Sequence, residues 1–144
     1  MNEAELGPPD YSIELPGYLT PALNSMLVRH WSKNRKEKLA LAWRVRVAWN
    51  RPLPIAPLPI ALVKIERRSI RWVDDDGMVG GCKGLLDILQ PCDPKRRPYG
   101  LGFIQDDSSR HIRLHARPVK VPRKVDQGTT VRIWALSSLP PSTF

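Results

Sequence analysis

Cysteine is scarce in this chain of 144 residues, which contains only Cys82 and Cys92. Two cysteines are too few for a disulfide framework, and they lack the partners that a zinc site requires. A reducing cytoplasm is therefore the expected compartment. No apolar run approaches the roughly 20 residues of a membrane-spanning helix, and the acidic N-terminus has no signal-peptide core. The sequence therefore predicts no contact with a membrane. It contains no internal repeats.

Acidic side chains are the minority among the charged residues. The chain has 14 Asp and Glu against 23 Lys and Arg, which gives a net charge of +9 and a pI near 10.1. This excess of positive charge favours a polyanionic partner, most simply a nucleic acid, over a merely soluble basic surface. The length is sufficient for one hydrophobic core and too short for two.

The few acids are unevenly distributed, because half of them fall in one short stretch. Seven of the 14 lie between residues 74 and 107, namely Asp74, Asp75, Asp76, Asp87, Asp93, Asp106 and Asp107. Like charges that gather in a fold cost free energy unless a cation lies between them. In a basic protein, a bound divalent metal beside a polyanion is the economical explanation. The pattern therefore points to metal-dependent nuclease chemistry.

Hydrophobic periodicity and turn residues predict an α+β fold, a single small domain with a mixed β-sheet packed by two principal helices. The expected strands cover residues 11–15, 60–70, 110–121 and 129–136, and the expected helices cover residues 32–49 and 80–89. In the first helix, Leu39, Trp43 and Val47 step by four, and the tryptophans are expected mainly in the core. Residues 1–10 and 137–144 are expected to be flexible tails.

The acid run follows the second expected strand. If its extended geometry continues, Asp74 and Asp76 project to one side and Asp75 to the other. Two carboxylates on one side can share a hard cation such as Mg²⁺. The alternative is a solvated acidic turn, because Asp-Asp-Asp-Gly is also good turn material.

The expected helix over residues 80–89 places Lys83 and Asp87 on one flank. Gly80 and Gly81 permit a close backbone approach at the helix start, where free N–H groups suit a phosphate. A lysine near a metal and a scissile phosphate can stabilise the developing negative charge. The third metal ligand must come from elsewhere, and Asp107 is the candidate.

These segments together match a known pattern. Asp-Asp-Asp-Gly-Met-Val-Gly-Gly-Cys-Lys-Gly-Leu-Leu-Asp at 74–87, followed by Gly-Phe-Ile-Gln-Asp-Asp at 102–107, resembles the RusA-like Holliday junction endonucleases of phages and prophages. The N-terminal part is similar as well, with Leu23-Asn24-Ser25 and Arg29-His30-Trp31 before a basic helix. The resemblance covers about residues 11–136. Gly77 stands where that family usually has an asparagine.

The resemblance implies a homodimer that cuts four-way DNA junctions in recombination and repair, in a bacterial or phage-infected cytoplasm, with Mg²⁺ or Mn²⁺ as cofactor. Carried over by position, the catalytic residues are Asp74, Asp76, Lys83 and Asp107, and the three aspartates among them are the metal ligands. Asp87 and Asp106 are supporting acids. The alternatives left open are a general branched or flap DNA nuclease and a branched-DNA-binding protein with little or no catalysis.

Two basic segments are the expected contacts to the DNA backbone, which dominates the affinity of such proteins. One precedes and begins the first helix, and the other lies in the loop after the second helix. The candidate residues are Arg29, His30, Lys33, Arg35, Lys36, Lys95, Arg96 and Arg97. For the second segment, the alternative is a plain solvated loop.

Overall fold

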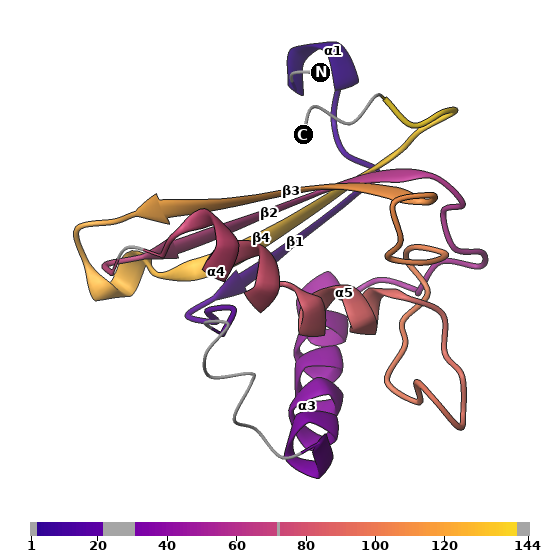
Figure 1. Cartoon of the computed structure of the whole chain (residues 1–144), viewed down its shortest axis with the longest axis horizontal. Coiled ribbons are helices and arrows are strands. Elements are labelled where there is room, and N and C mark those ends of the chain that lie inside the picture. The colour runs from indigo at the N-terminus through magenta and orange to yellow at the C-terminus, as the bar shows by residue number, and fades with distance from the viewer. Residues whose placement is uncertain (1–2, 22–30, 72, 141–144) are drawn as a thin grey trace.

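The computed structural model of the chain describes residues 3–21, 31–71 and 73–140. It contains one mixed sheet of four strands, β1 (Tyr11–Pro16), β2 (Ala61–Ser69), β3 (Ile112–Lys120) and β4 (Gly128–Ala135). The spatial order is β1-β4-β2-β3 (Figure 1). β2 and β3 are parallel, whereas β4 runs antiparallel to both β1 and β2. The predicted α+β class and all four predicted strands are confirmed.

Three helices lie on one side of this sheet: α3 (Trp31–Trp49), α4 (Asp75–Gly81) and α5 (Lys83–Leu89). Figure 1 shows α4 and α5 beneath the strands, while the N-terminal half of α3 extends away from them. The core forms between the inward sheet residues, such as Val63 and Ile133, and the helix residues Val45 and Leu85, all fully buried. Apolar side chains that recur every second residue in the strands explain this one-sided packing.

Helix α3 carries apolar side chains on two opposite sides. Its inward side is formed by Leu41, Ala42 and Val45, which are buried. The stripe that predicted the helix, Leu39, Trp43 and Val47, points away from the core and is 44%, 67% and 59% exposed. The helix itself is confirmed, but the expectation that the tryptophans are mainly core residues is wrong for Trp43.

The acid run does not continue the strand, which corrects the predicted alternation of Asp74 and Asp76. β2 ends at Ser69, and the chain then enters α4 at Asp75, with Asp74 in extended conformation as the N-cap. An aspartate before a helix satisfies N–H groups that would otherwise lack an acceptor, so the run acts as a helix start. Gly80 and Gly81 therefore lie at the C-terminal end of α4, and the predicted anion-binding helix start at these glycines is wrong.

The opposite face of the sheet is covered at one end by the N-terminal segment, which includes α1 (Glu3–Leu6). The indole Nε1 of Trp134 donates to the Gly7 carbonyl at 3.0 Å, and Asp10 Oδ2 accepts from the Ala135 N–H at 2.7 Å. Residues expected as a loose tail thus bond to β4. Figure 1 shows α1 above one end of the strands, on the side away from α3, α4 and α5.

The described residues include no helix that is both long and apolar enough to cross a bilayer. Cys82 is buried and Cys92 is exposed, and neither forms a disulfide. Burial raises the pKa of the Cys82 thiol to about 12, although the charge of Arg67 acts in the opposite direction. A thiol with this pKa stays protonated at neutral pH, so Cys82 is a core residue and not a nucleophile.

Candidate functional site

The loop after α5 brings the second group of acids beside the first. Backbone N–H groups of residues 101–104 donate to the carbonyl groups of residues 88–90, at 2.8 to 3.0 Å. These bonds occupy carbonyl groups that a helix end leaves without an intrahelical partner. The loop is thereby fixed to the end of α5, and Asp106 and Asp107 follow directly. The outcome is a cluster of Asp87, Asp106 and Asp107, defined here as the acid cluster.

Electrostatic interaction within the acid cluster is visible in the pKa of Asp107. Partial burial raises this pKa, and the negative charges of Asp87 and Asp106 raise it further. Asp106 behaves differently, because hydrogen bonds from Ser108 and from the Asp107 N–H outweigh its burial and lower its pKa. The ionisation of Asp107 is thus opposed by its neighbours, and an added cation would relieve this repulsion.

Asp87 also has a cationic partner, which comes from α3. Lys38 Nζ of α3 donates to Asp87 Oδ2 at 2.7 Å, and the two side chains are only 26% and 17% exposed. The same ammonium lies 5.6 Å from the ring centroid of Tyr99. Burial lowers the pKa of Lys38, but the hydrogen bond and charge of Asp87 outweigh it, so the net shift is upward.

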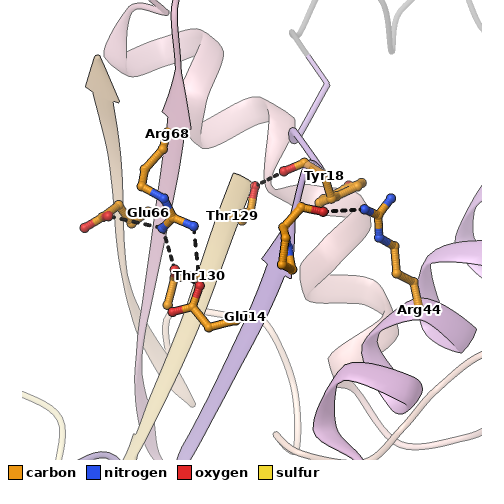
Figure 2. Close-up of polar contacts among 8 residues, drawn as sticks. Glu14, Tyr18, Arg44, Glu66, Arg68, Thr129 and Thr130 are labelled. Atoms are coloured by element: carbon orange, nitrogen blue, oxygen red, sulfur yellow. Dashed lines mark hydrogen bonds and ion pairs between the residues drawn. The ribbon is translucent and has the colours of Figure 1, made fainter. Parts of the chain in front are cut away.

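A hollow of about 550 Å³ separates α3 from α5 beside this ion pair. Lys83, Asp87, Lys38 and Arg44 contribute to its lining, so the predicted Lys83–Asp87 flank does face a concave surface. Arg44 is fixed at the rim, where it donates to the Pro16 carbonyl at 2.7 Å (Figure 2). Lys83 is exposed at this hollow, and the other charged residues of the lining are Lys38, Arg44 and the two acids Glu37 and Asp87.

Asp74 has a structural task that the sequence interpretation missed. Its Oδ1 accepts a 2.6 Å hydrogen bond from the Gly77 N–H and caps α4. A Cβ atom at residue 77 would lie 2.8 Å from this oxygen, which is too close. A glycine at this position therefore avoids a clash with the capping carboxylate. The asparagine that the resemblance leads one to expect at this position would force the Asp74 carboxylate to move. The departure at Gly77 therefore has a local structural explanation.

Of the three predicted metal ligands, only Asp107 lies with the two supporting acids. Asp87, Asp106 and Asp107 interact, whereas the carboxylate of Asp74 is bonded to the start of α4. The side chains of Asp75 and Asp76 lie outside the described part of the structure. Among the side chains that are described, no group of three His, Cys, Asp or Glu residues is placed to hold a metal ion. The oxygen donors of Asp87 and Asp107 are nevertheless of the type that Mg²⁺ prefers, and their repulsion is what a bound cation would relieve.

The predicted DNA contacts fall into three groups. Arg29 and His30 lie outside the described residues, and Lys33 belongs to α3 without a described side chain. Arg35 and Lys36 are exposed on α3. Lys95 and Arg96 are exposed at the tip of a tight turn, in which their N–H groups donate to Asp93 Oδ1, and Arg97 pairs with Asp93 through the backbone.

Sequence inspection missed Lys38 and Tyr99 as members of this site. Lys38 lies on the same side of α3 as Leu41, Ala42 and Val45. A lysine at a core-facing helical position signals a buried partner, because an unpaired ammonium is rarely buried. That signal was available in the sequence, whereas nothing in the spacing indicates Tyr99.

Comparisons of the chain with family models, with curated proteins and with solved structures returned no match.

Proposed function

We propose that this protein is a metal-dependent endodeoxyribonuclease that cuts branched DNA, with the four-way junction as its substrate. The observation that carries the proposal is the acid cluster, in which the charges of Asp87 and Asp106 oppose the ionisation of Asp107. Repelling carboxylates beside a hollow that contains the exposed Lys83 suit a divalent cation and a phosphodiester. The net charge of +9 and the resemblance of residues 74–107 to RusA-like nucleases support the same conclusion.

The roles of the individual residues follow from their positions. Asp107 and Asp87 would hold Mg²⁺ or Mn²⁺, with Asp74 and Asp76 as the further ligands that the resemblance implies. When bound, such an ion stabilises negative charge on the reacting phosphate and activates water. Lys83 lines the hollow and would stabilise the charge that develops on the phosphate oxygens. Lys38 holds Asp87 in place and acts as a positioning residue.

A homodimer belongs to this proposal, because two sites related by a twofold axis can cut two opposed strands of a junction. The exposed stripe of Leu39, Trp43 and Val47 on α3 supports it. Large apolar side chains that gather on one exposed helix face mark an interaction site more often than a solvated surface. A second copy of the chain, which presents the same stripe, is the proposed occupant.

Cleavage of a labelled four-way junction tests the proposal directly. The protein is expected to cut the junction in Mg²⁺, to be inactive in EDTA, and to leave a linear duplex intact. Lys83→Ala should slow single-turnover cleavage on the order of a hundredfold, the usual size for one charge-stabilising group. Lys83→Arg should also be slow, because a guanidinium keeps the charge and loses the compact geometry.

Each alternative has a distinct result in the same assay. Equal cleavage of junction, flap and duplex would indicate a general nuclease. Tight junction binding without any Mg²⁺-dependent or Mn²⁺-dependent cleavage would indicate a DNA-binding protein without catalysis. A Lys83→Ala variant that binds weakly but cuts at the normal rate once bound would make Lys83 a phosphate anchor.

A further inference from the structure

Gly84 lies in the first turn of α5, at a position where the packing does not require a glycine. A Cβ atom at residue 84 would meet no heavy atom of the described residues within 4 Å, its own helix backbone aside. At Gly81, by contrast, a Cβ atom would collide with the Pro21 carbonyl oxygen. Glycine destabilises a helix relative to alanine, so an isolated helical glycine usually has a packing or functional reason, such as close approach of a ligand. Gly84 lines the hollow between α3 and α5.

Much of the lining of this hollow is apolar. Leu19 and Pro21 contribute to it from the segment after β1, and Ala40 and Leu41 contribute from α3. The volume of about 550 Å³ falls within the roughly 300–1,000 Å³ of pockets that bind small organic ligands. A phosphate group alone gains nothing from apolar walls, because apolar surface cannot replace its hydrogen bonds to water. The lining therefore suits a ligand that has an apolar body beside its charge.

Tyr18 adds an aromatic residue to this lining, and its backbone is held on both sides. Its N–H donates to the Leu15 carbonyl at 3.2 Å, and its carbonyl accepts from Thr129 Oγ1 at 2.7 Å (Figure 2). The guanidinium of Arg44, which donates to the Pro16 carbonyl, lies 5.6 Å from the centroid of the Tyr18 ring. An aromatic ring with a cation beside it is a common platform for a nucleobase.

The hollow is continuous with the acid cluster, because both include Asp87. Lys83, which is exposed at the hollow, directly precedes Gly84 in the chain. A DNA strand with a phosphate at Lys83 would therefore bring an adjacent base to the open space at Gly84. The apolar walls and the aromatic residue then lie where the base would be.

We propose that this hollow receives one nucleobase that is displaced from its stack at the branch point of the DNA. The base would lie between the backbone at Gly84 and the apolar residues of α3, with its phosphate at Lys83. The inference rests on the proposed function for the identity of the ligand, and it adds a subsite for the base. Displacement costs least for bases that are not fully paired and stacked. Such a subsite would therefore favour branched DNA over a continuous duplex.

Variants that fill the hollow test the proposal through DNA binding in EDTA, where metal-dependent cleavage cannot occur. Gly84→Leu and Ala40→Leu each place a larger side chain at the hollow. Each should weaken binding of a labelled four-way junction roughly tenfold, the size of one lost stacking contact, and leave binding of a linear duplex unchanged. Ala48→Leu makes the same change at an exposed position of α3 outside the lining. This matched control should stay within about twofold of the unmodified protein.

Thermal unfolding shows whether the variants are folded. Gly84→Leu should not lower the unfolding midpoint, because leucine favours a helix more than glycine does. Ala40→Leu changes an exposed position and leaves the core intact. A loss of junction binding in both variants would therefore come from the filled hollow.

Single nucleotides identify which part of the ligand enters the hollow. The backbone N–H signals of Gly84 and Ala40 are followed by NMR while dAMP, dCMP, dGMP or dTMP is added to the full chain. At least one of these nucleotides should shift both signals. Deoxyribose 5-phosphate, which lacks a base, is the control and should leave the Ala40 signal in place.

Several results would overturn the proposal. Unchanged junction binding in both hollow variants, or equal losses in Ala40→Leu and Ala48→Leu, would show that the hollow receives no base. Equal shifts with the sugar phosphate would indicate a site for phosphate alone, and equal losses for duplex and junction would indicate a contact to continuous DNA. Absence of cleavage in Mg²⁺ would refute the nuclease and leave the base site standing. Normal cleavage by a Gly84→Leu variant with normal junction affinity would refute the base site alone.

Discussion

The ammonium of Lys38 lies 2.7 Å from the carboxylate of Asp87, and this ion pair joins the middle of α3 to the last turn of α5. Asp87 is at the same time one of the charges that raise the pKa of Asp107. The two helices are therefore connected through a carboxylate that also belongs to the acid cluster. Lys38 and Asp107 thus both interact with Asp87, although the three side chains come from distant parts of the sequence.

Replacement of Lys38 by methionine should destabilise the protein in the absence of metal. The change leaves Asp87 without its cation in a site that is mostly shielded from water. A loss of about 1–2 kcal/mol is expected, between the values for exposed and buried pairs. Urea unfolding in EDTA measures this loss, and Lys36→Met, at an exposed position of the same helix, is the control. Equal losses in the two variants would show that the ion pair contributes nothing specific.

Asp107→Asn should make the metal-free protein more stable at neutral pH while it abolishes cleavage. The pKa of Asp107 is raised in the folded state, so its ionisation opposes folding, and stability declines as the pH rises from the unfolded pKa through the folded pKa. Asparagine removes that effect. The gain should therefore disappear in acid, where Asp107 is already protonated in both states.

Thermal unfolding at pH 3 and pH 7, in EDTA, compares the Asp107→Asn variant with the unmodified protein. Added Mg²⁺ should then stabilise the unmodified protein alone, because a ligand that binds only the folded state raises its stability. A variant that is less stable at pH 7, or one that cuts junctions normally, would contradict the role given to Asp107.

Asp74→Ser should separate the capping role of Asp74 from its proposed role as a metal ligand. Serine is a good N-cap, so the stability of α4 should be retained, whereas Asp74→Ala should cost about 1 kcal/mol. Both variants lack the carboxylate, and both should lose cleavage if Asp74 binds metal. The measurements are the unfolding midpoint and the single-turnover rate. An active Asp74→Ser variant would show that Asp74 acts only as the N-cap of α4 and does not bind metal.

Leu39→Gln/Trp43→Gln should convert a dimer to a monomer without loss of fold. The two side chains are 44% and 67% exposed, so the change removes apolar surface and leaves the core intact. Light scattering after size exclusion should give a mass near 16.4 kDa for the variant and twice that for the unmodified protein. Arg46→Gln, at another exposed position of α3, is the control. A monomeric unmodified protein would refute the homodimer.

The strands were predictable because local pattern and tertiary packing agree in them. At every second position, β2 places Ala61, Val63 and Ile65 inward and β4 places Val131 and Ile133 inward. Which side of α3 faces the sheet was not predictable from the pattern of the helix alone. The helix has two apolar sides, and which one faces the sheet depends on the facing residues, such as Leu85.

The sequence predicted which residues belong to the candidate site better than it predicted how they are arranged. The sequence indicated Lys83, Asp87 and Asp107 as members of one site, and these residues do lie on α5 and on the loop bonded to it. Asp74 was misplaced because strand periodicity was extended through a residue type that caps helices. The Asp74 and Gly77 pair is a helix-start signal in itself. Lys38 was missed because its partner is distant in sequence.

The two parallel neighbours β2 and β3 are joined by one long connection, which contains α4, α5 and the loop to Asp107. Within it, the turn at residues 94–96 is closed at its base by the backbone pairing of Asp93 with Arg97. Residues inserted between these two positions would lengthen only a loop that is already closed, at about 0.6 kcal/mol for each doubling of its length. The protein can therefore vary this projecting segment, and whatever it contacts, while the positions of Asp87 and Asp107 stay the same.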